Sequence, residues 1–187
     1  IDFAGDEDEY RQFLPLLERL PENVISIVAY SLSKTFTLYG TRCGAMICVA
    51  KIQEIADEFK RVCEYSSRGT WSNTARIGQA ILSKIYSDRE LLRRVSEERA
   101  YYRNMLLARG RAFSDAAKEC GLEIVPFDAG FFVSVPCDAP DKYSRILERE
   151  DVFLVPLAKG IRVSVASLSE EKCRRLPPII RKVLEQA

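Results

Sequence analysis

The pattern that most constrains the fold of this chain is an alternation of short apolar runs with longer amphipathic segments. The runs at 23–31 and 44–50 have strand length and are rich in β-branched residues, so we expect two buried strands. Residues 51–67 and 72–88 carry apolar side chains at helical spacing. Strands this apolar, separated by helical segments, predict an α/β protein with a mostly parallel sheet that is covered on both faces.

A long helix is predicted in the middle of the chain. Its pattern begins at Ser87, a candidate N-cap, and extends to Cys120, where Gly121 is suited to end it. Gly110 permits a bend or a break on the way. A helix of this length usually bridges two subdomains.

The last third of the chain changes character, because Gly and Pro interrupt several short strand-like runs. The predicted strands are 122–127, 130–136, 152–157 and 161–166, and the predicted helices are 141–150 and 169–186, the second capped by Ser169. These segments predict a smaller α/β layer. We therefore divide the chain into residues 1–100 and residues 101–187.

Composition excludes several kinds of function. The 187 residues include no histidine, which excludes Ser–His–Asp catalysis and His-ligated metals within this chain. The six cysteines form no C-x-x-C pair and fit no zinc framework, so we expect reduced thiols, no metal and a cytoplasmic location. A net charge of +1 gives no reason to expect nucleic acid as a partner, and no apolar run approaches the ~18–20 residues that span a membrane.

The segment AYSLSKTFTLYGTRCGA, residues 29–45, contains the strongest candidate site. A phosphate-binding loop that ends at Lys34 would need glycine at positions 28 and 33, which hold Val28 and Ser33. The alternative fits better, because Lys34 directly follows a predicted strand, with hydroxyl groups beside it and Arg42 further along the loop. A lysine amine can form a Schiff base with an aldehyde, and hydroxyls and arginine bind phosphate. Together they point to pyridoxal 5′-phosphate as the cofactor.

The same segment resembles the lysine signature of class I pyridoxal-phosphate-dependent aminotransferases, which has glycine, arginine and glycine six, eight and ten residues after the lysine. Lys34, Gly40, Arg42 and Gly44 are in register with that pattern. The resemblance implies the C-terminal part of a fold-type-I transferase, with residues 1–100 from the large cofactor-binding domain and residues 101–187 as the small domain. It implies that Lys34 is the catalytic residue and that Ser31 and Arg42 bind the cofactor phosphate.

Two further segments resemble the same family. In SRGTWSN, residues 67–73, Ser72 matches a residue that binds the phosphate of the neighbouring subunit, which implies a homodimer. Arg68 matches the residue that binds a dicarboxylic side chain in aspartate and aromatic aminotransferases. In GIRVSVASLS, Arg162 matches the residue that binds the substrate α-carboxylate. The simpler alternatives are an exposed Arg68, a Ser72 that only caps the next helix, and an Arg162 in a structural ion pair.

The resemblance implies transamination between an amino acid, of aspartate or aromatic type, and a 2-oxo acid such as 2-oxoglutarate. A lyase of the same fold and a non-catalytic regulatory domain are the alternatives. Because the chain begins at Ile1, we expect a fragment that is inactive alone. Asp2 resembles the aspartate that pairs with the pyridine nitrogen in the motif D-x-A-Y, but Gly5 stands where tyrosine belongs. Asp2 and an aspartate upstream both remain candidates for that role.

Overall fold

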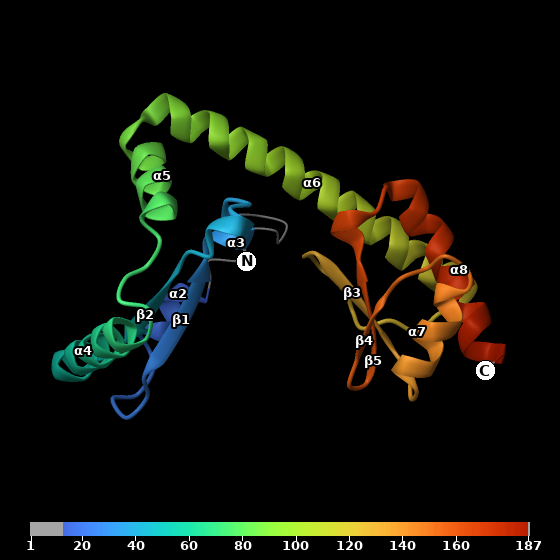
Figure 1. Cartoon of the computed structure of the whole chain (residues 1–187), viewed down its shortest axis with the longest axis horizontal. Coiled ribbons are helices and arrows are strands. Elements are labelled where there is room, and N and C mark those ends of the chain that lie inside the picture. The colour runs from blue at the N-terminus through green and yellow to red at the C-terminus, as the bar shows by residue number, and fades with distance from the viewer. Residues whose placement is uncertain (1–12, 187) are drawn as a thin grey trace. The chain divides into compact units, whose positions relative to one another are not determined.

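The computed structural model describes residues 13–186, which divide into two compact units (Figure 1). Arg99 ends the first unit and Ala100 begins the second. Asp2, the candidate partner of the pyridine nitrogen, lies outside the described residues. No helix among residues 13–186 combines the length and the apolar character that crossing a membrane requires.

The first unit contains a two-stranded sheet. In chain order its elements are α2 (Leu14–Leu17), β1 (Ser26–Ser31), α3 (Leu32–Thr35), the 3-10 helix η1 (Tyr39–Thr41), β2 (Gly44–Val49), α4 (Gln53–Thr70) and α5 (Arg76–Ser87). β1 and β2 pair antiparallel, from Ser26 opposite Val49 to Ser31 opposite Gly44. The sequence predicts a mostly parallel sheet, and this pair of strands differs from that prediction because it is antiparallel. The loop between them folds back on itself, so β2 returns beside β1 in the opposite direction.

The two strands are also more exposed than their sequences predict. Residues of β1 alternate between half-buried and exposed, and the first four residues of β2 are exposed. The core of this unit lies instead between the loop after β1 and α5. It consists of Leu32, Phe36, Cys43 and Ile85. A Cβ atom on Gly78 would lie 2.8 Å from the Cβ of Cys43, so glycine lets α5 approach the loop closely.

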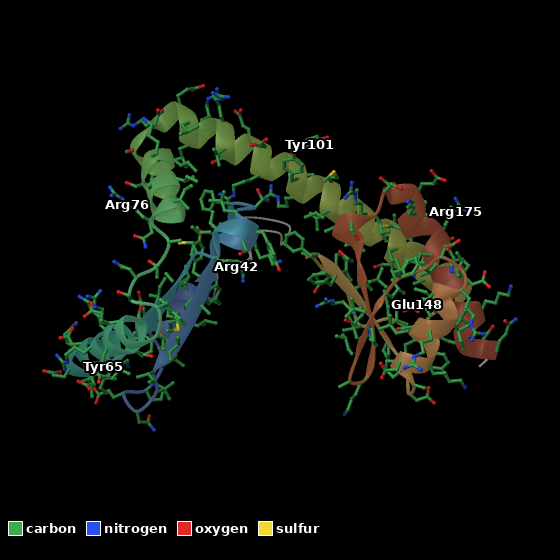
Figure 2. All side chains as sticks on the ribbon, viewed as in Figure 1. Arg42, Tyr65, Arg76, Tyr101, Glu148 and Arg175 are labelled. Carbon is green, nitrogen blue, oxygen red and sulfur yellow. The ribbon has the colours of Figure 1, made fainter. Side chains whose placement is uncertain are left out.

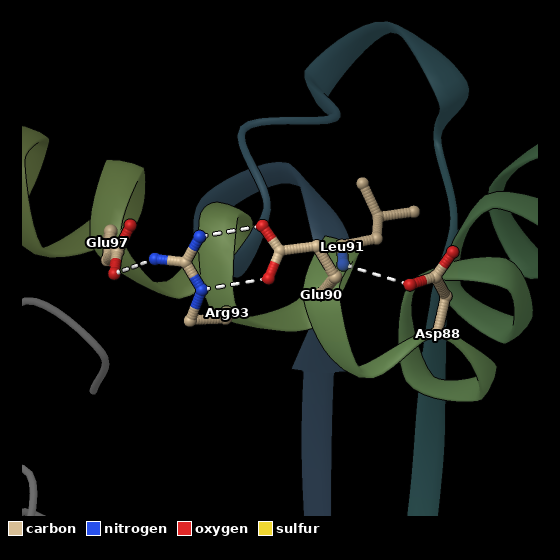
Figure 3. A network of polar contacts seen from close by, with 5 residues as sticks. All are labelled: Asp88, Glu90, Leu91, Arg93 and Glu97. Atoms are coloured by element: carbon tan, nitrogen blue, oxygen red, sulfur yellow. Dashed lines mark hydrogen bonds and ion pairs between the residues drawn. The ribbon is translucent and has the colours of Figure 1, made fainter.

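Helix α6 (Arg89–Cys120) begins in the first unit with a polar network (Figure 3). Asp88 Oδ1 accepts a hydrogen bond from Leu91 N at 3.1 Å and caps the helix. The predicted cap at Ser87 is wrong, since the Ser87 hydroxyl donates to the carbonyl of Ser83 at 2.8 Å. One turn on, Arg93 lies between Glu90 and Glu97, with nitrogen–oxygen distances of 2.6 Å to each.

The second unit is a three-stranded antiparallel sheet packed on helices. After α6 its elements are β3 (Phe132–Pro136), α7 (Pro140–Glu148), β4 (Val155–Leu157), β5 (Gly160–Ser164), the 3-10 helix η2 (Val165–Ser167) and α8 (Glu170–Gln186). The strand order is β3-β5-β4, so β5 is central. The strand predicted at 122–127 is absent. Val125 N donates to Ser134 O at 2.9 Å, but Pro126 has no N–H with which to continue a ladder.

Two helix boundaries and one packing contact in this unit follow from single residues. Gly121 has a φ of 71° and ends α6 as predicted. Ser169 caps α8 as predicted, because its Oγ accepts a hydrogen bond from Lys172 N at 3.2 Å. The ring of Phe127 occupies the place that a Cβ would take on Gly110, and α6 continues unbroken past this glycine.

The sheet of the second unit buries one face. Its core contains Val133 and Val135 of β3 and Ile161 and Val163 of β5, and the helices add fully buried side chains. Those helix residues are Phe113 of α6, Leu147 of α7, and Cys173 and Ile180 of α8. Alternate residues, including Arg162, lie on the opposite and less buried face.

Candidate active site

Lys34 lies on a short helix that begins where β1 ends. Ser31, the last residue of β1, caps α3, because its Oγ accepts a hydrogen bond from Ser33 N at 3.3 Å. Leu32 is 2% exposed and anchors the helix in the core. Leu32 N also donates to Cys43 O at 3.1 Å, which joins the two ends of the loop. Lys34 is thus at the C-terminal end of a strand, where the sequence places it.

Arg42 approaches the same loop from its far side. Its Nη1 donates to Tyr39 O at 3.1 Å and to Ser33 Oγ at 3.4 Å. The Tyr39 ring has the Arg42 guanidinium carbon 4.9 Å and Lys34 Nζ 5.1 Å from its centroid, both within cation–π range. Lys34 and Arg42 are both exposed in this chain.

Arg68 and Ser72 form a second pair at the end of α4. Arg68 Nη1 donates to Ser72 Oγ at 2.8 Å, and Ser72 has a left-handed backbone with φ of 67°. The pair lines an open groove of about 810 Å³ beside β2, together with apolar residues that include Met46 and Phe59. Arg68 is exposed, as the simpler alternative expects, but it is fixed to Ser72.

Arg162 occupies the middle of β5 in the second unit. It lies opposite Ser134 of β3 and Val155 of β4. Its guanidinium carbon is 4.4 Å from the centroid of the Phe132 ring. Within residues 13–186 no carboxylate forms an ion pair with Arg162, so the structural ion pair weighed as an alternative finds no support there. Its positive charge is half-buried on the less buried face of the sheet.

Two cysteines of the second unit, Cys137 and Cys173, are poor candidates for a competing nucleophile. Burial raises the pKa of the Cys173 thiol, and burial together with the nearby Asp138 carboxylate raises that of Cys137. A thiol with a raised pKa stays protonated at neutral pH and reacts poorly. All six cysteines are free. Within residues 13–186, no cluster of three or more metal-ligating side chains occurs.

A family model described as aminotransferase class I and II matches residues 1–178. The chain belongs to this family. Among curated aminotransferases, it is 29% identical over 164 residues to the aspartate aminotransferase of Haemophilus influenzae, covering 84% of this chain and 40% of that protein.

Solved aminotransferase structures have the same fold. The chain superposes on an aminotransferase from Anaerococcus prevotii with a TM-score of 0.91 and 37% identity, covering 97% of this chain and 44% of that one. An aromatic-amino-acid aminotransferase from Burkholderia pseudomallei, solved covalently bound to pyridoxal phosphate, gives a TM-score of 0.74 at 22% identity, covering 98% of this chain and 45% of that one. The predicted α/β fold class, part of a fold-type-I aminotransferase, is confirmed. The chain spans less than half the length of these relatives.

Within the aminotransferase chain, the predicted site residues fall into three places. Ser31, Lys34 and Arg42 lie on one loop, Arg68 and Ser72 share a hydrogen bond at the end of α4, and Arg162 is in the second unit. The sequence alone indicated no role for Tyr39, although its ring contacts both Lys34 and Arg42. Its position, five residues after the lysine and three before the arginine, is the signal that could have singled it out.

Proposed function

We propose that this chain is part of a pyridoxal-phosphate-dependent aminotransferase in which Lys34 is the catalytic residue. The observation that carries the proposal is the convergence of the Lys34 amine and the Arg42 guanidinium on the Tyr39 ring, directly after β1. An amine can form a Schiff base with an aldehyde, and a guanidinium can bind a phosphate. The two side chains therefore suit a small molecule that carries an aldehyde and a phosphate.

The residues of the loop match the cofactor's two functional groups. Arg42 offers its guanidinium to the phosphate, and the Ser31 hydroxyl can still donate a proton, because its oxygen only accepts in the cap of α3. The bound cofactor supplies an electron sink for the substrate's α-carbon. Lys34 would hold the cofactor through its amine, and the same amine, once the substrate has displaced it, would carry a proton to and from that carbon.

Two arginines are proposed to select the substrate. Arg162 binds the α-carboxylate, which its half-buried position on the less buried face of β5 favours. Arg68 binds a side-chain carboxylate, and Ser72 binds phosphate in a neighbouring subunit of a homodimer. The amino donor is of aspartate or aromatic type, as the names of the Haemophilus and Burkholderia relatives suggest, and the acceptor is a 2-oxo acid such as 2-oxoglutarate.

We also propose that these 187 residues lack transaminase activity on their own. Large apolar side chains of the first sheet, Ile27, Met46 and Ile47, are exposed, and such surfaces in a protein usually have a partner. A two-stranded sheet is marginally stable without further strands or packing.

The six free thiols fit a reducing, cytoplasmic location.

Borohydride trapping tests the catalytic role of Lys34. The protein is mixed with pyridoxal phosphate, reduced with borohydride, and digested for mass spectrometry of the lysine-containing peptides. We expect the adduct on Lys34 and its loss in Lys34→Arg, which keeps the positive charge but has no reactive amine. An adduct spread over the exposed lysines, and unchanged in Lys34→Arg, would contradict the assignment.

The products formed from the amino acid distinguish the transaminase from the lyase. Release of pyruvate and ammonia in place of ping-pong amino transfer would indicate the lyase.

A further inference from the structure

Tyr39 is an exposed aromatic residue on a loop whose neighbouring residues are anchored. Its side chain is 63% exposed, so packing in the core does not explain its position. Leu38 N donates to Leu32 O at 3.2 Å, and the Leu38 side chain packs against the buried cluster that contains Leu32 and Phe36. The loop therefore fixes the backbone of Tyr39 while its ring projects outward.

Two cations contact this ring. Lys34 Nζ lies 5.1 Å and the Arg42 guanidinium carbon 4.9 Å from its centroid. Arg42 contacts both the ring and the backbone of Tyr39, since its Nη1 also donates to Tyr39 O at 3.1 Å. Arg42 itself has a left-handed backbone, with φ of 49°, which non-glycine residues adopt rarely. The loop thus keeps an uncommon conformation in which Arg42 meets the tyrosine.

Like charges that share a small volume repel, and the electron-rich face of an aromatic ring offsets part of that repulsion. We infer that Tyr39 is a positioning residue whose ring holds the Lys34 amine and the Arg42 guanidinium close enough for one small phosphorylated aldehyde to reach both. The inference rests on the proposed function. It adds that the aromatic ring, and not the tyrosine hydroxyl, does the positioning.

The test compares two aldehydes on the full chain: pyridoxal phosphate and pyridoxal, which lacks the phosphate. Each is reduced onto the protein with borohydride, and the adduct on Lys34 is quantified by peptide mapping. Wild-type protein should label Lys34 more strongly with pyridoxal phosphate. Tyr39→Leu should lower this preference about two- to five-fold, the range expected for an exposed cation–π contact. Tyr39→Phe keeps the ring and should retain the wild-type preference.

Tyr65→Leu is the matched control, because Tyr65 is an exposed tyrosine on α4 of the same unit, well away from Arg42 (Figure 2). It should leave the preference unchanged. Proton NMR gives a second readout: the Lys34 and Arg42 side-chain resonances should show ring-current shifts that Tyr39→Leu removes and Tyr39→Phe keeps.

The outcomes separate this inference from the proposed function. Equal labelling of Lys34 by the two aldehydes in wild-type protein would overturn the phosphate-binding role of Arg42, and the inference with it. A wild-type preference that persists in Tyr39→Leu would overturn only the role of Tyr39. A loss in Tyr39→Phe as large as that in Tyr39→Leu would assign the effect to the hydroxyl and also overturn the inference.

Discussion

The Arg68 guanidinium donates a hydrogen bond to the Ser72 hydroxyl at 2.8 Å, across the left-handed turn that ends α4. The contact fixes one end of a long, rotamer-rich side chain before any ligand arrives. The Ser72 oxygen accepts in this bond, so its own proton remains available to a second acceptor. The two proposed ligand-binding groups at this position are therefore already oriented together.

Arg68→Gln should change substrate preference in a full-length protein that carries these residues. Glutamine keeps a donor for Ser72 but lacks the charged fork that pairs with a carboxylate. We expect kcat/KM for a dicarboxylic amino acid to fall about 10- to 100-fold, the size of a lost charge-assisted hydrogen bond, with little change for an aromatic one. Steady-state kinetics with both substrates measures this difference. Equal losses for the two would show that Arg68 does not contact the side-chain carboxylate.

Phe113→Ala should destabilise the second unit strongly. The Phe113 side chain is 0% exposed and belongs to the core between α6 and the sheet, so its removal leaves a cavity. Truncations of this kind cost about 3–5 kcal/mol in the free energy of unfolding. Urea denaturation measures the change, with Tyr101→Ala as the control on the same helix, because Tyr101 is 66% exposed. A loss for Phe113→Ala no larger than for the control would contradict the packing described.

The capping contact at Asp88 predicts a pH dependence of stability. The hydrogen bond from Leu91 N, assisted by the charge of Lys84, lowers the pKa of the Asp88 carboxyl. A carboxyl with a lowered pKa stabilises the folded state above its unfolded pKa of about 3.9, and the stabilisation is lost as the pH falls through the folded value.

Asp88→Asn keeps a side-chain oxygen as cap but removes the charge, so it should be less stable than wild type at pH 7. The difference should shrink as the pH falls from about 4 through the lowered pKa of the folded wild-type carboxyl, where that carboxyl becomes protonated. Thermal unfolding of both proteins at pH 7, 4 and 2.5 measures this difference in stability. Asp115→Asn, within α6, controls for the general effect of removing an acidic charge. A difference independent of pH would rule out the contribution of the charged cap.

Local signals in the sequence predicted local features well. The Ser169 cap and the glycine that ends α6 depend on side chains and backbone preferences within one turn, and both were found where predicted. The position of Lys34 after a strand depends only on the run that precedes it. By contrast, strand direction depends on which segments pair across the chain, and periodicity carries no information about that. The hydrogen bond from Leu32 N to Cys43 O closes the loop through which the chain returns along β1 as β2.

Two other differences have the same origin. Ser87 and Asp88 are both good capping residues, and only the geometry between α5 and α6 decides that Asp88 caps α6. The role inferred for Tyr39 depends on two cations that meet at its ring, one from α3 and one from beyond η1. A single aromatic residue in a loop sequence gives no indication of such a meeting.

The alternation along β5 has a consequence for the charge that the strand carries. Ile161 and Val163 are fully buried, and Arg162 between them points to the other face. If β5 slipped by one residue against its neighbours, both apolar side chains would turn outward and the guanidinium would enter the core. The buried apolar residues of β5 therefore fix the register of the strand. The position of the arginine is set by residues that touch no ligand.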